Sequence, residues 1–522
     1  MIAWQKPPTA EILAVFDRPY EGAVAAARTC YSGNGIVSAD QVSGVGLPAE
    51  KAAQRQLQRD RIAASTFAAG HHTTLQHGHV SFGLDDVSRQ VVWSLLHSHP
   101  FHNSEQVSQR YVEVRPDRVA VPLLPEPAQS VYRACVQQQM TAYQQLIQLL
   151  EPVAAAEYFK VFKARAKQPQ RWLSAIHKRA QEVARYVLPL ATHTYLVHTV
   201  SVLTLLRYRL ICQEPDAPSE ARALVDAMCE ALYARDPLLR QLPVQPLERE
   251  DLPVWGQLEP SQARAAAEVF DARQGDYTSL LIDRFASNPQ RVAESVRQVL
   301  GQTPAQLSDD AAIGLALDPA QNPLLGQALQ TGAHQKLGRA LHAAHYCFAK
   351  RLSHAADSQD QRHRTTPGAR PTVQALRLDA PDYVTPPLVT LAGGEALQVY
   401  RLAMEQSWYA IQQLQTLGID PEFQAYLLPN AVQVRYTQTT DLQGLRHKHA
   451  MRLCLNAQEE IWQASMQEAA QILAVEPQIG QFLLPPCAIR HRAGQRPYCP
   501  EGDRFCGVPI WQLPREQWVR TL

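Results

Sequence analysis

The sequence lacks long hydrophobic runs and lacks an excess of charge of either sign. It contains no stretch of about 18 apolar residues, and its first residues do not have the pattern of a signal peptide. Its 50 Lys and Arg residues balance 49 Asp and Glu residues, which leaves a formal net charge of +1. These features predict a globular protein that does not cross a membrane and does not bind nucleic acid through bulk charge.

The sequence also lacks the cysteine pattern of a disulfide-rich protein. Its nine cysteines are scattered at irregular spacings through helix-like segments. Disulfide frameworks are typical of small secreted domains, whereas scattered thiols are typical of reducing compartments. We therefore expect reduced cysteines and a cytoplasmic location.

The two halves of the chain repeat one order of elements. Each half opens with a strand-like run followed by a helix, at residues 11–32 and 277–300. A later helix in each half ends in a basic triplet, 97–99 and 362–364, at an offset of 265. Further on, residues 189–220 pair without gaps with residues 429–460, at an offset of 240. The first half therefore has about 25 extra residues, which we place around 150–178.

This repeat predicts the domain organisation and the fold class. We expect a first repeat at 1–245, a Pro- and Gln-rich linker at 246–276, a second repeat at 277–480 and a Cys- and Pro-rich tail at 481–522. Apolar residues at three- and four-residue spacing predict helices at 131–150 and 395–418. Alternating runs at 79–87 and 373–384 predict strands. The expected class is α+β, helix-rich, with one small central antiparallel sheet in each repeat.

Short motifs follow one another in the first half. A Gly-His-x-Thr turn at 70–73 precedes a strand, a helix and a loop that ends in Ser108-Gln109-Arg110-Tyr111. This order resembles the core of the flavin-dependent thymidylate synthases, which have an Arg-His-Arg triplet before a Ser-x-Arg-Tyr loop. The triplet of this half departs from that pattern, because it is His97-Ser98-His99.

The second half has the complementary set of motifs. It keeps Arg362-His363-Arg364, with Gln359 three residues earlier, but Thr372 and Gln374 stand where the Ser and Arg of the loop would be. The same division continues downstream. The family's Arg before Val-Leu-Pro is Arg185 in the first half and Ala425 in the second, whereas its late Arg is Cys212 in the first half and Arg452 in the second.

The resemblance implies a composite nucleotide site. In this family one subunit supplies the Gln, the first Arg of the triplet and the late Arg, and its neighbour supplies the loop and the Arg before Val-Leu-Pro. Complementary loss predicts one working site between the halves, one decayed site, and a homodimer that forms a pseudo-tetramer. The implied nucleotide-binding residues are Gln106, Ser108, Arg110, Arg185, Gln359, Arg362 and Arg452.

The resemblance also implies the reaction, which is reductive methylation of dUMP at C5 with FAD, methylenetetrahydrofolate and NADPH. Arginine forks suit phosphate and uracil oxygens, so Arg110 and Arg452 are expected to polarise the base while Ser108 positions it. The residues implied for the flavin are Thr73, Arg362, His363, Arg364 and His447. Two alternatives remain open: methylation of another uridine nucleotide, and a non-catalytic protein that binds nucleotide or flavin.

Some positions depart from the family pattern, and one cluster lies outside it. Gln76 and Gln106 stand where the family has Glu, and Ser201 and Asp441 stand where it has Asn. The tail carries a possible zinc set, although its spacing matches no standard finger, and free thiols in an ordered cap are the simpler interpretation. That set is Cys487, His491, Cys499 and Cys506.

Overall fold

The computed structural model describes residues 4–214, 216–245, 260–376 and 378–520, and it divides into two compact units. Unit 1 comprises Met1–Gln137, Pro189–Leu258 and Tyr409–Leu427. Unit 2 comprises Gln138–Leu188, Glu259–Trp408 and Leu428–Leu522. Each unit thus contains most of one repeat together with a segment of the other repeat.

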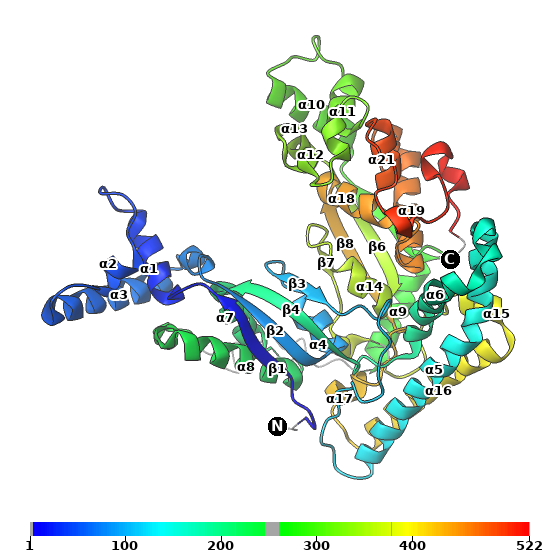
Figure 1. The fold of residues 1–522 in the computed structure, drawn as a ribbon, viewed down its shortest axis with the longest axis horizontal. Helices are drawn as coiled ribbons and strands as arrows, with labels where there is room; N and C mark the ends of the chain where they lie inside the picture. Colours follow the sequence, from blue (N-terminus) through cyan, green and yellow to red (C-terminus); the bar gives the residue numbers. More distant parts are fainter. Residues whose placement is uncertain (1–3, 215, 246–259, 377, 521–522) are drawn as a thin grey trace. The chain divides into compact units, whose positions relative to one another are not determined.

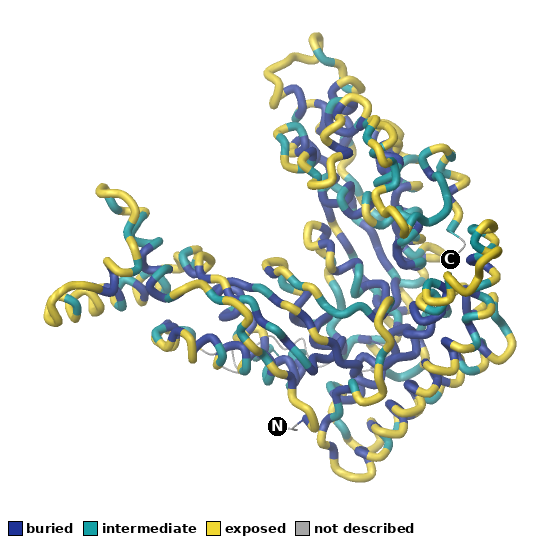
Figure 2. Tube along the Cα trace, viewed as in Figure 1, coloured by how far each residue is buried: buried dark blue, intermediate teal, exposed yellow. Residues whose placement is uncertain are grey.

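Unit 1 contains a four-stranded antiparallel sheet in the order β1-β2-β4-β3. The strands are β1 (Thr9–Val15), β2 (His79–Ser88), β4 (His193–Ser201) and β3 (Asn103–Gln106). The helices α7 (Val202–Ile211) and α8 (Ser219–Arg235) lie along this sheet (Figure 1). Apolar residues of these elements and of α1 (Pro19–Thr29) form one buried core, whereas α3 (Ala49–Ala68) is mostly exposed (Figure 2).

Short helices connect these elements of unit 1. They are α2 (Ala39–Ser43), η1 (His72–Gln76), α4 (Arg89–Val91), η2 (Val92–Leu96) and η6 (Pro237–Gln241). From the second repeat, unit 1 takes α17 (Pro421–Ala425) and the end of α16 (Gly394–Thr416).

Unit 2 contains a second antiparallel sheet with the matching order β5-β6-β8-β7. Its strands are β5 (Ser279–Arg284), β6 (His345–Ser353), β8 (Gln433–Asp441) and β7 (Gly368–Ala369). The helices α10 (Asn288–Leu300), α11 (Asp309–Leu317), α18 (Leu442–Arg452) and α19 (Glu459–Val475) pack their apolar faces into its core. The first repeat contributes residues 138–161 of α5 (Ala128–Val161), followed by η3 (Lys163–Lys167), η4 (Pro169–Trp172), α6 (Leu173–Ala184) and η5 (Arg185–Val187).

The remaining elements of unit 2 are shorter helices and the helices of the tail. They are α9 (Pro260–Gln274), η9 (Pro323–Gly326), α12 (Thr331–His334), α13 (Lys336–Arg339), η10 (Ala340–Ala343), α14 (His354–Asp360), η11 (Val373–Ala375), α15 (Pro387–Ala392), α20 (Pro477–Gly480), α21 (Pro486–Arg492), η12 (Gly502–Arg504), η13 (Ile510–Gln512) and η14 (Arg515–Gln517). In the part of the chain that the structure describes, no helix is both long and apolar enough to cross a membrane.

Each unit contains one segment of the other repeat, which we call its exchanged segment: residues 138–188 in unit 2 and residues 409–427 in unit 1. A buried tyrosine attaches each exchanged segment to its unit. In unit 2, Tyr186 of the first repeat donates a hydrogen bond to Glu460 Oε2 at 2.8 Å, and the Ser353 hydroxyl donates to the same oxygen at 2.6 Å. In unit 1, Tyr426 of the second repeat donates to Glu220 Oε2 at 2.7 Å, and the Ser88 amide donates to Oε1. The same tyrosine–glutamate contact therefore occurs at equivalent positions of the two repeats.

We expect Tyr186→Phe and Tyr426→Phe to destabilise the protein. Each removes a donor to a buried carboxylate, which costs about 1.5–3 kcal/mol. The loss should be larger for Tyr186→Phe, because the Gln458 amide also donates to the Tyr186 hydroxyl. Chemical denaturation measures both free energies of unfolding, and two variants as stable as the wild type would contradict this role.

Several expectations from the sequence can now be compared with the fold. The predicted strand at 79–87 and the helices at 131–150 and 395–418 are confirmed, and the sheets are small and antiparallel. The predicted strand at 373–384 is wrong: the described residues of this segment begin with η11 and form no strand, and Tyr383 makes an isolated bridge with Val432. Residues 246–259 of the expected linker lie outside the described residues, and 260–274 form the Ala-rich helix α9.

Candidate functional site

The basic triplet of the second repeat follows directly after a short capped helix. The Ser353 hydroxyl caps α14 by accepting the Ala356 amide at 3.0 Å, and the helix ends at Asp360. Gln359 lies in its last turn, and its Nε2 is buried with no hydrogen-bond partner among the described residues. Since buried donors are almost always paired, this amide fits a site that receives a polar ligand.

The late arginine of α18 lies against this triplet. Arg452 Nε donates to His363 Nε2 at 2.7 Å, and Nη2 donates to the Gln359 carbonyl at 3.1 Å. Burial and the Arg452 charge hold the pKa of His363 well below its ordinary value, so the ring is neutral and accepts this bond. Arg362 and Arg364 are exposed on either side of His363.

Two further residues of α18, His447 and Arg446, come shortly before Arg452. His447 lies edge-on to His363, with ring centroids 5.9 Å apart, and its Nδ1 pairs with Gln330 Oε1 at 2.7 Å. Arg446 is buried, and in the described part of the chain it has no hydrogen-bond or ion-pair partner. Burial lowers the pKa of Arg446 to about 10. A buried guanidinium without a counter-ion is costly unless an anion binds there.

A network of buried ion pairs links the end of α14 to β6, α18 and α19. Lys350 Nζ contacts Asp360 at 2.9 Å and Glu468 at 3.0 Å, and Lys448 Nζ contacts Glu468 at 2.9 Å. Although burial opposes ionisation of Asp360, the two lysines hold its pKa well below the ordinary value. These ion pairs hold Asp360, the last residue of α14, in place.

The exchanged segment brings a first-repeat arginine into the same unit. Arg185 is buried at the start of η5, where its Nε donates to the Glu182 carbonyl at 3.1 Å and its own carbonyl accepts from Asn430 Nδ2. Unit 2 thus contains three of the four predicted arginines, Arg185, Arg362 and Arg452. The equivalent positions in unit 1 are Ala425, His97 and Cys212.

In unit 1, a buried thiol and a stacked imidazole occupy two of these equivalent positions. Cys212 is buried, and burial raises its pKa to about 12, so the thiol stays protonated. His97 stacks on His102 with ring centroids 5.2 Å apart, and His102 stacks on His198 at 5.4 Å. His99 lies edge-on to Tyr208, with ring centroids 5.6 Å apart, and a decayed site at His97 and His99 stays a prediction.

The imidazole stack and the neighbouring His99 predict acid sensitivity. Burial, followed by neighbouring positive charge, lowers the pKa of His198 to about 3 and that of His99 to about 4. Both rings are neutral in the folded protein, whereas the unfolded chain takes up protons below about pH 6.5. The unfolding free energy should therefore fall between pH 6.5 and 4, by about 1.4 kcal/mol per pH unit for each histidine.

Urea unfolding across this pH range measures the slope. His198→Gln, which copies Gln438 of the second repeat, should make the dependence shallower. The exposed His71 provides the control, because His71→Gln should leave the slope unchanged. An unchanged slope in His198→Gln would contradict the role of the stack.

The Ser-x-Arg loop lies in unit 1 and follows β3. Ser108 Oγ accepts the Arg110 amide at 3.3 Å, and Arg89 Nη2 donates to the Val107 carbonyl at 2.9 Å, which holds the loop. The Arg110 guanidinium lies 5.4 Å from the centre of the Tyr111 ring. Gln106 Oε1 is buried without a partner among the described residues. In the second repeat, Arg370 of the corresponding loop is fixed by a two-nitrogen contact to Asp357.

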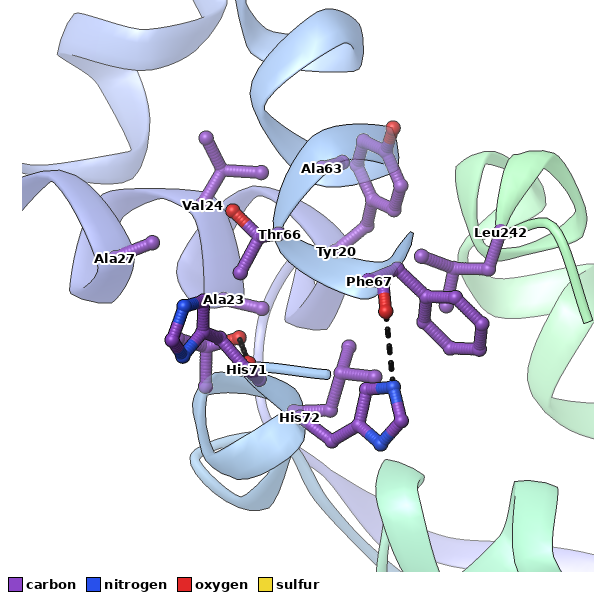
Figure 3. Close-up of a pocket in the computed structure, with 12 residues that line it drawn as sticks. Tyr20, Ala23, Val24, Ala27, Ala63, Thr66, Phe67, His71, His72 and Leu242 are labelled. Atoms are coloured by element: carbon purple, nitrogen blue, oxygen red, sulfur yellow. Dashed lines mark hydrogen bonds between the residues drawn. The ribbon is translucent and has the colours of Figure 1, made fainter. Parts of the chain in front are cut away.

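The Gly-His-x-Thr turn also lies in unit 1. It forms η1, in which Thr73 is exposed and His72 Nε2 pairs with the Phe67 carbonyl at 3.0 Å (Figure 3). A small apolar cavity of about 20 Å³ lies between this turn, α1 and α3. The predicted flavin residues are therefore divided: Thr73 is in unit 1, and the other four are in unit 2.

A larger cavity in unit 2 adjoins Glu182 and Tyr186 of the exchanged segment. Its volume is about 800 Å³, which suits a small organic ligand. One wall is apolar, with Pro386, Leu388 and Leu391, and the remaining lining is largely polar. That polar lining includes Arg179, Glu182, Gln458, Glu459 and Arg520.

The predicted tail set does not appear as a formed metal site. In the described residues, no group of three or more His, Cys, Asp and Glu side chains has the geometry of one. The ring of His491 instead lies edge-on to Tyr498, at 4.8 Å between ring centroids.

These features define a duplicated α+β protein in which one unit gathers arginines and histidines around the end of a short helix. The Thy1 family model, described as thymidylate synthase complementing protein, matches residues 11–238 and again residues 280–478. The chain therefore belongs to this family and contains two copies of its domain.

Individual relatives match over shorter stretches, and each carries the name flavin-dependent thymidylate synthase. One from Mycobacterium avium is 35% identical over 133 residues, which are 25% of this chain and 48% of the relative. One from Mycobacterium sp. (strain KMS) is 29% identical over 172 residues, 32% and 63% of the two chains. One from Geobacter sulfurreducens is 28% identical over 182 residues, 34% and 75%. The chain spans about half to two thirds of the first curated relatives it matches.

Proposed function

We propose that this protein is an FAD-dependent methyltransferase that methylates dUMP at C5. The observation that supports this most strongly is the location of Arg185. It comes from the first repeat, yet it lies in the unit that holds Arg362 and Arg452 of the second repeat. Unit 1 has no arginine at the three equivalent positions, so one site keeps the cations and the other has lost them.

The proposed nucleotide ligand matches these side chains. A nucleoside monophosphate carries about two negative charges and is well suited to guanidinium forks. Arg452 is held in place by its bonds to His363 and to the Gln359 carbonyl, so its orientation is set before the ligand binds. The unpaired Gln359 Nε2 is a donor for a phosphate or uracil oxygen.

Gln106, Ser108 and Arg110 are proposed to contact the same nucleotide. This part of the proposal depends on the sequence, in which the first repeat keeps these residues and the second repeat has lost them. They would come from the same chain or from a second copy in a homodimer. Arginines on the uracil carbonyls would draw negative charge onto C5 through electrostatic activation, and Ser108 would position the base.

The residues around His363 fit the flavin cofactor. Burial lowers the pKa of Arg446, and the phosphate groups of a flavin nucleotide would supply a counter-charge for it. Arg362, His363, Arg364 and His447 would hold the cofactor in unit 2, and Thr73 would add a hydroxyl from unit 1. The bound flavin supplies redox chemistry, with NADPH as reductant and methylenetetrahydrofolate as the carbon donor.

An anaerobic assay tests this function. Purified protein is given FAD, NADPH, methylenetetrahydrofolate and dUMP, and dTMP is followed by chromatography. Formation of dTMP supports the proposal. Binding of FAD without dTMP would redirect the search to another uridine nucleotide, and failure to bind either FAD or dUMP would favour a non-catalytic role.

A further inference from the structure

A tryptophan near the start of the chain fills a space inside unit 1. The ring centroid of Trp4 lies 5.8 Å from that of Phe423 and 4.9 Å from that of Tyr426. Trp4 also makes an isolated antiparallel bridge with Pro122, and its side chain is buried. The indole ring therefore closes a space that Phe423, Tyr426 and Pro122 surround.

The internal repeat identifies the residues that surround the same space in unit 2. At the offset of 240, Phe423 corresponds to Val183 and Tyr426 to Tyr186. Both Val183 and Tyr186 line the cavity of about 800 Å³ in unit 2.

A second part of the cavity wall is also repeat-related to the Trp4 site. The isolated bridges of residues 119 and 383 are made with positions 192 and 432, which correspond at the offset of 240, so this part of the repeat has an offset of 264. Pro122 therefore corresponds to Pro386, which lines the cavity. The space that an indole ring fills in unit 1 is thus open in unit 2.

Two differences between the repeats account for the open space. In unit 1 the segment before β1 carries Trp4, whereas in unit 2 the helix α9 precedes β5. In addition, the Val183 side chain is smaller than that of Phe423.

The polar lining of the cavity also differs from its counterpart in unit 1. There, Glu422 accepts hydrogen bonds from the amide and the hydroxyl of Ser219, both at 2.6 Å. The equivalent residues of unit 2 are Glu182 and Glu459, so a second carboxylate replaces the donor. Burial raises the pKa of Glu459, the charge of Arg520 opposes this shift, and the charge of Glu182 adds to it.

The charges that line the cavity balance one another. Arg179 Nη1 lies 3.6 Å from Glu182 Oε2, and Arg520 and Glu459 supply a second cation and a second carboxylate. A ligand of one sign would satisfy only half of these groups. A zwitterion presents its carboxylate to the arginines and its ammonium group to the glutamates.

We propose that this cavity binds an aromatic zwitterion, a small molecule that carries an ammonium group and a carboxylate beside a ring of up to indole size. The ring would lie against Val183, Tyr186 and Pro386, as the ring of Trp4 lies against their counterparts in unit 1. The polar lining of both signs then fixes the charged end of the molecule.

The cavity is distinct from the proposed nucleotide site. Its described lining does not include Arg185, Arg362 or Arg452. The proposal therefore does not depend on the proposed methyltransferase activity.

Isothermal titration of the purified full-length protein with L-tryptophan tests the site. We expect saturable binding. Tryptamine, which lacks the carboxylate, and indolepropionate, which lacks the ammonium group, should each bind at least about tenfold more weakly, because each leaves charged side chains without a partner. No binding of tryptophan, or equal binding of the three compounds, would overturn the proposal.

Variants locate the binding. Val183→Trp would fill the cavity and should abolish tryptophan binding, whereas Val299→Trp, the same change at an exposed position of α10, should leave it unchanged. Glu459→Gln tests the charge with little change in packing: it should weaken tryptophan binding and leave indolepropionate binding unchanged. Full tryptophan affinity in Val183→Trp or in Glu459→Gln would overturn the assignment.

Competition with dUMP separates this site from the nucleotide site. Saturating dUMP should leave the affinity for tryptophan unchanged. Displacement of tryptophan by dUMP would make the cavity part of the nucleotide site and would overturn a separate site. A protein that binds tryptophan but no dUMP would contradict the proposed function and leave this inference in place.

Discussion

Arg452→Ala is expected to lower the affinity for dUMP by about 100-fold. Loss of one charged donor from a desolvated phosphate or carbonyl contact costs about 2–5 kcal/mol, and each 1.4 kcal/mol is tenfold. Isothermal titration with dUMP measures the change. The side chain also bonds His363 and the Gln359 carbonyl, so circular dichroism must confirm that the variant remains folded.

The internal repeat provides the matched control for this variant. Cys212 occupies the equivalent position in unit 1, where it is buried as a protonated thiol. Cys212→Ala should leave dUMP affinity within about twofold of the wild type, since it removes no hydrogen bond to a charged group. Equal losses in the two variants, or normal binding by Arg452→Ala, would contradict a single nucleotide site.

Arg446→Met is expected to raise the melting temperature of the cofactor-free protein and to abolish retention of FAD. A buried guanidinium without a partner destabilises the fold, and an apolar side chain of similar length would stabilise it by about 1–4 kcal/mol. The same change would remove the cation that we assign to the flavin phosphates. Stability and binding should therefore change in opposite directions.

Thermal unfolding and flavin absorbance after desalting measure the two effects. The first repeat has Leu206 at the equivalent position, buried in the core of unit 1, so an apolar residue is compatible with this helix. Leu206→Met is the control and should leave flavin retention unchanged. A less stable Arg446→Met protein that still retains FAD would show that Arg446 has a purely structural role.

The sequence was most informative where periodicity and repetition agree. The run at 79–87 alternates from His79 to Leu84, and the structure has β2 there, with burial that alternates over the same residues. The run at 373–384 also alternates, but Pro381 lies within it, and its described residues form an isolated bridge in place of a strand. Proline removes the amide that a strand needs, and this effect outweighed the pattern.

Other features of the site depend on tertiary packing. The local sequence does not predict that residues 138–188 belong to unit 2 and residues 409–427 to unit 1. An amphipathic helix can bury its apolar face against the core of its own repeat or of the other repeat. Arg446 differs from an ordinary surface arginine only through its burial.

The stoichiometry of dUMP binding tests the central proposal most directly. Isothermal titration of the FAD-loaded full-length protein should give one dUMP per chain, because only one of the two repeat-related sets keeps its arginines. Two equivalent dUMP molecules per chain would show that the set with His97, Cys212 and Ala425 also binds nucleotide, and the proposal of one working site would then be wrong.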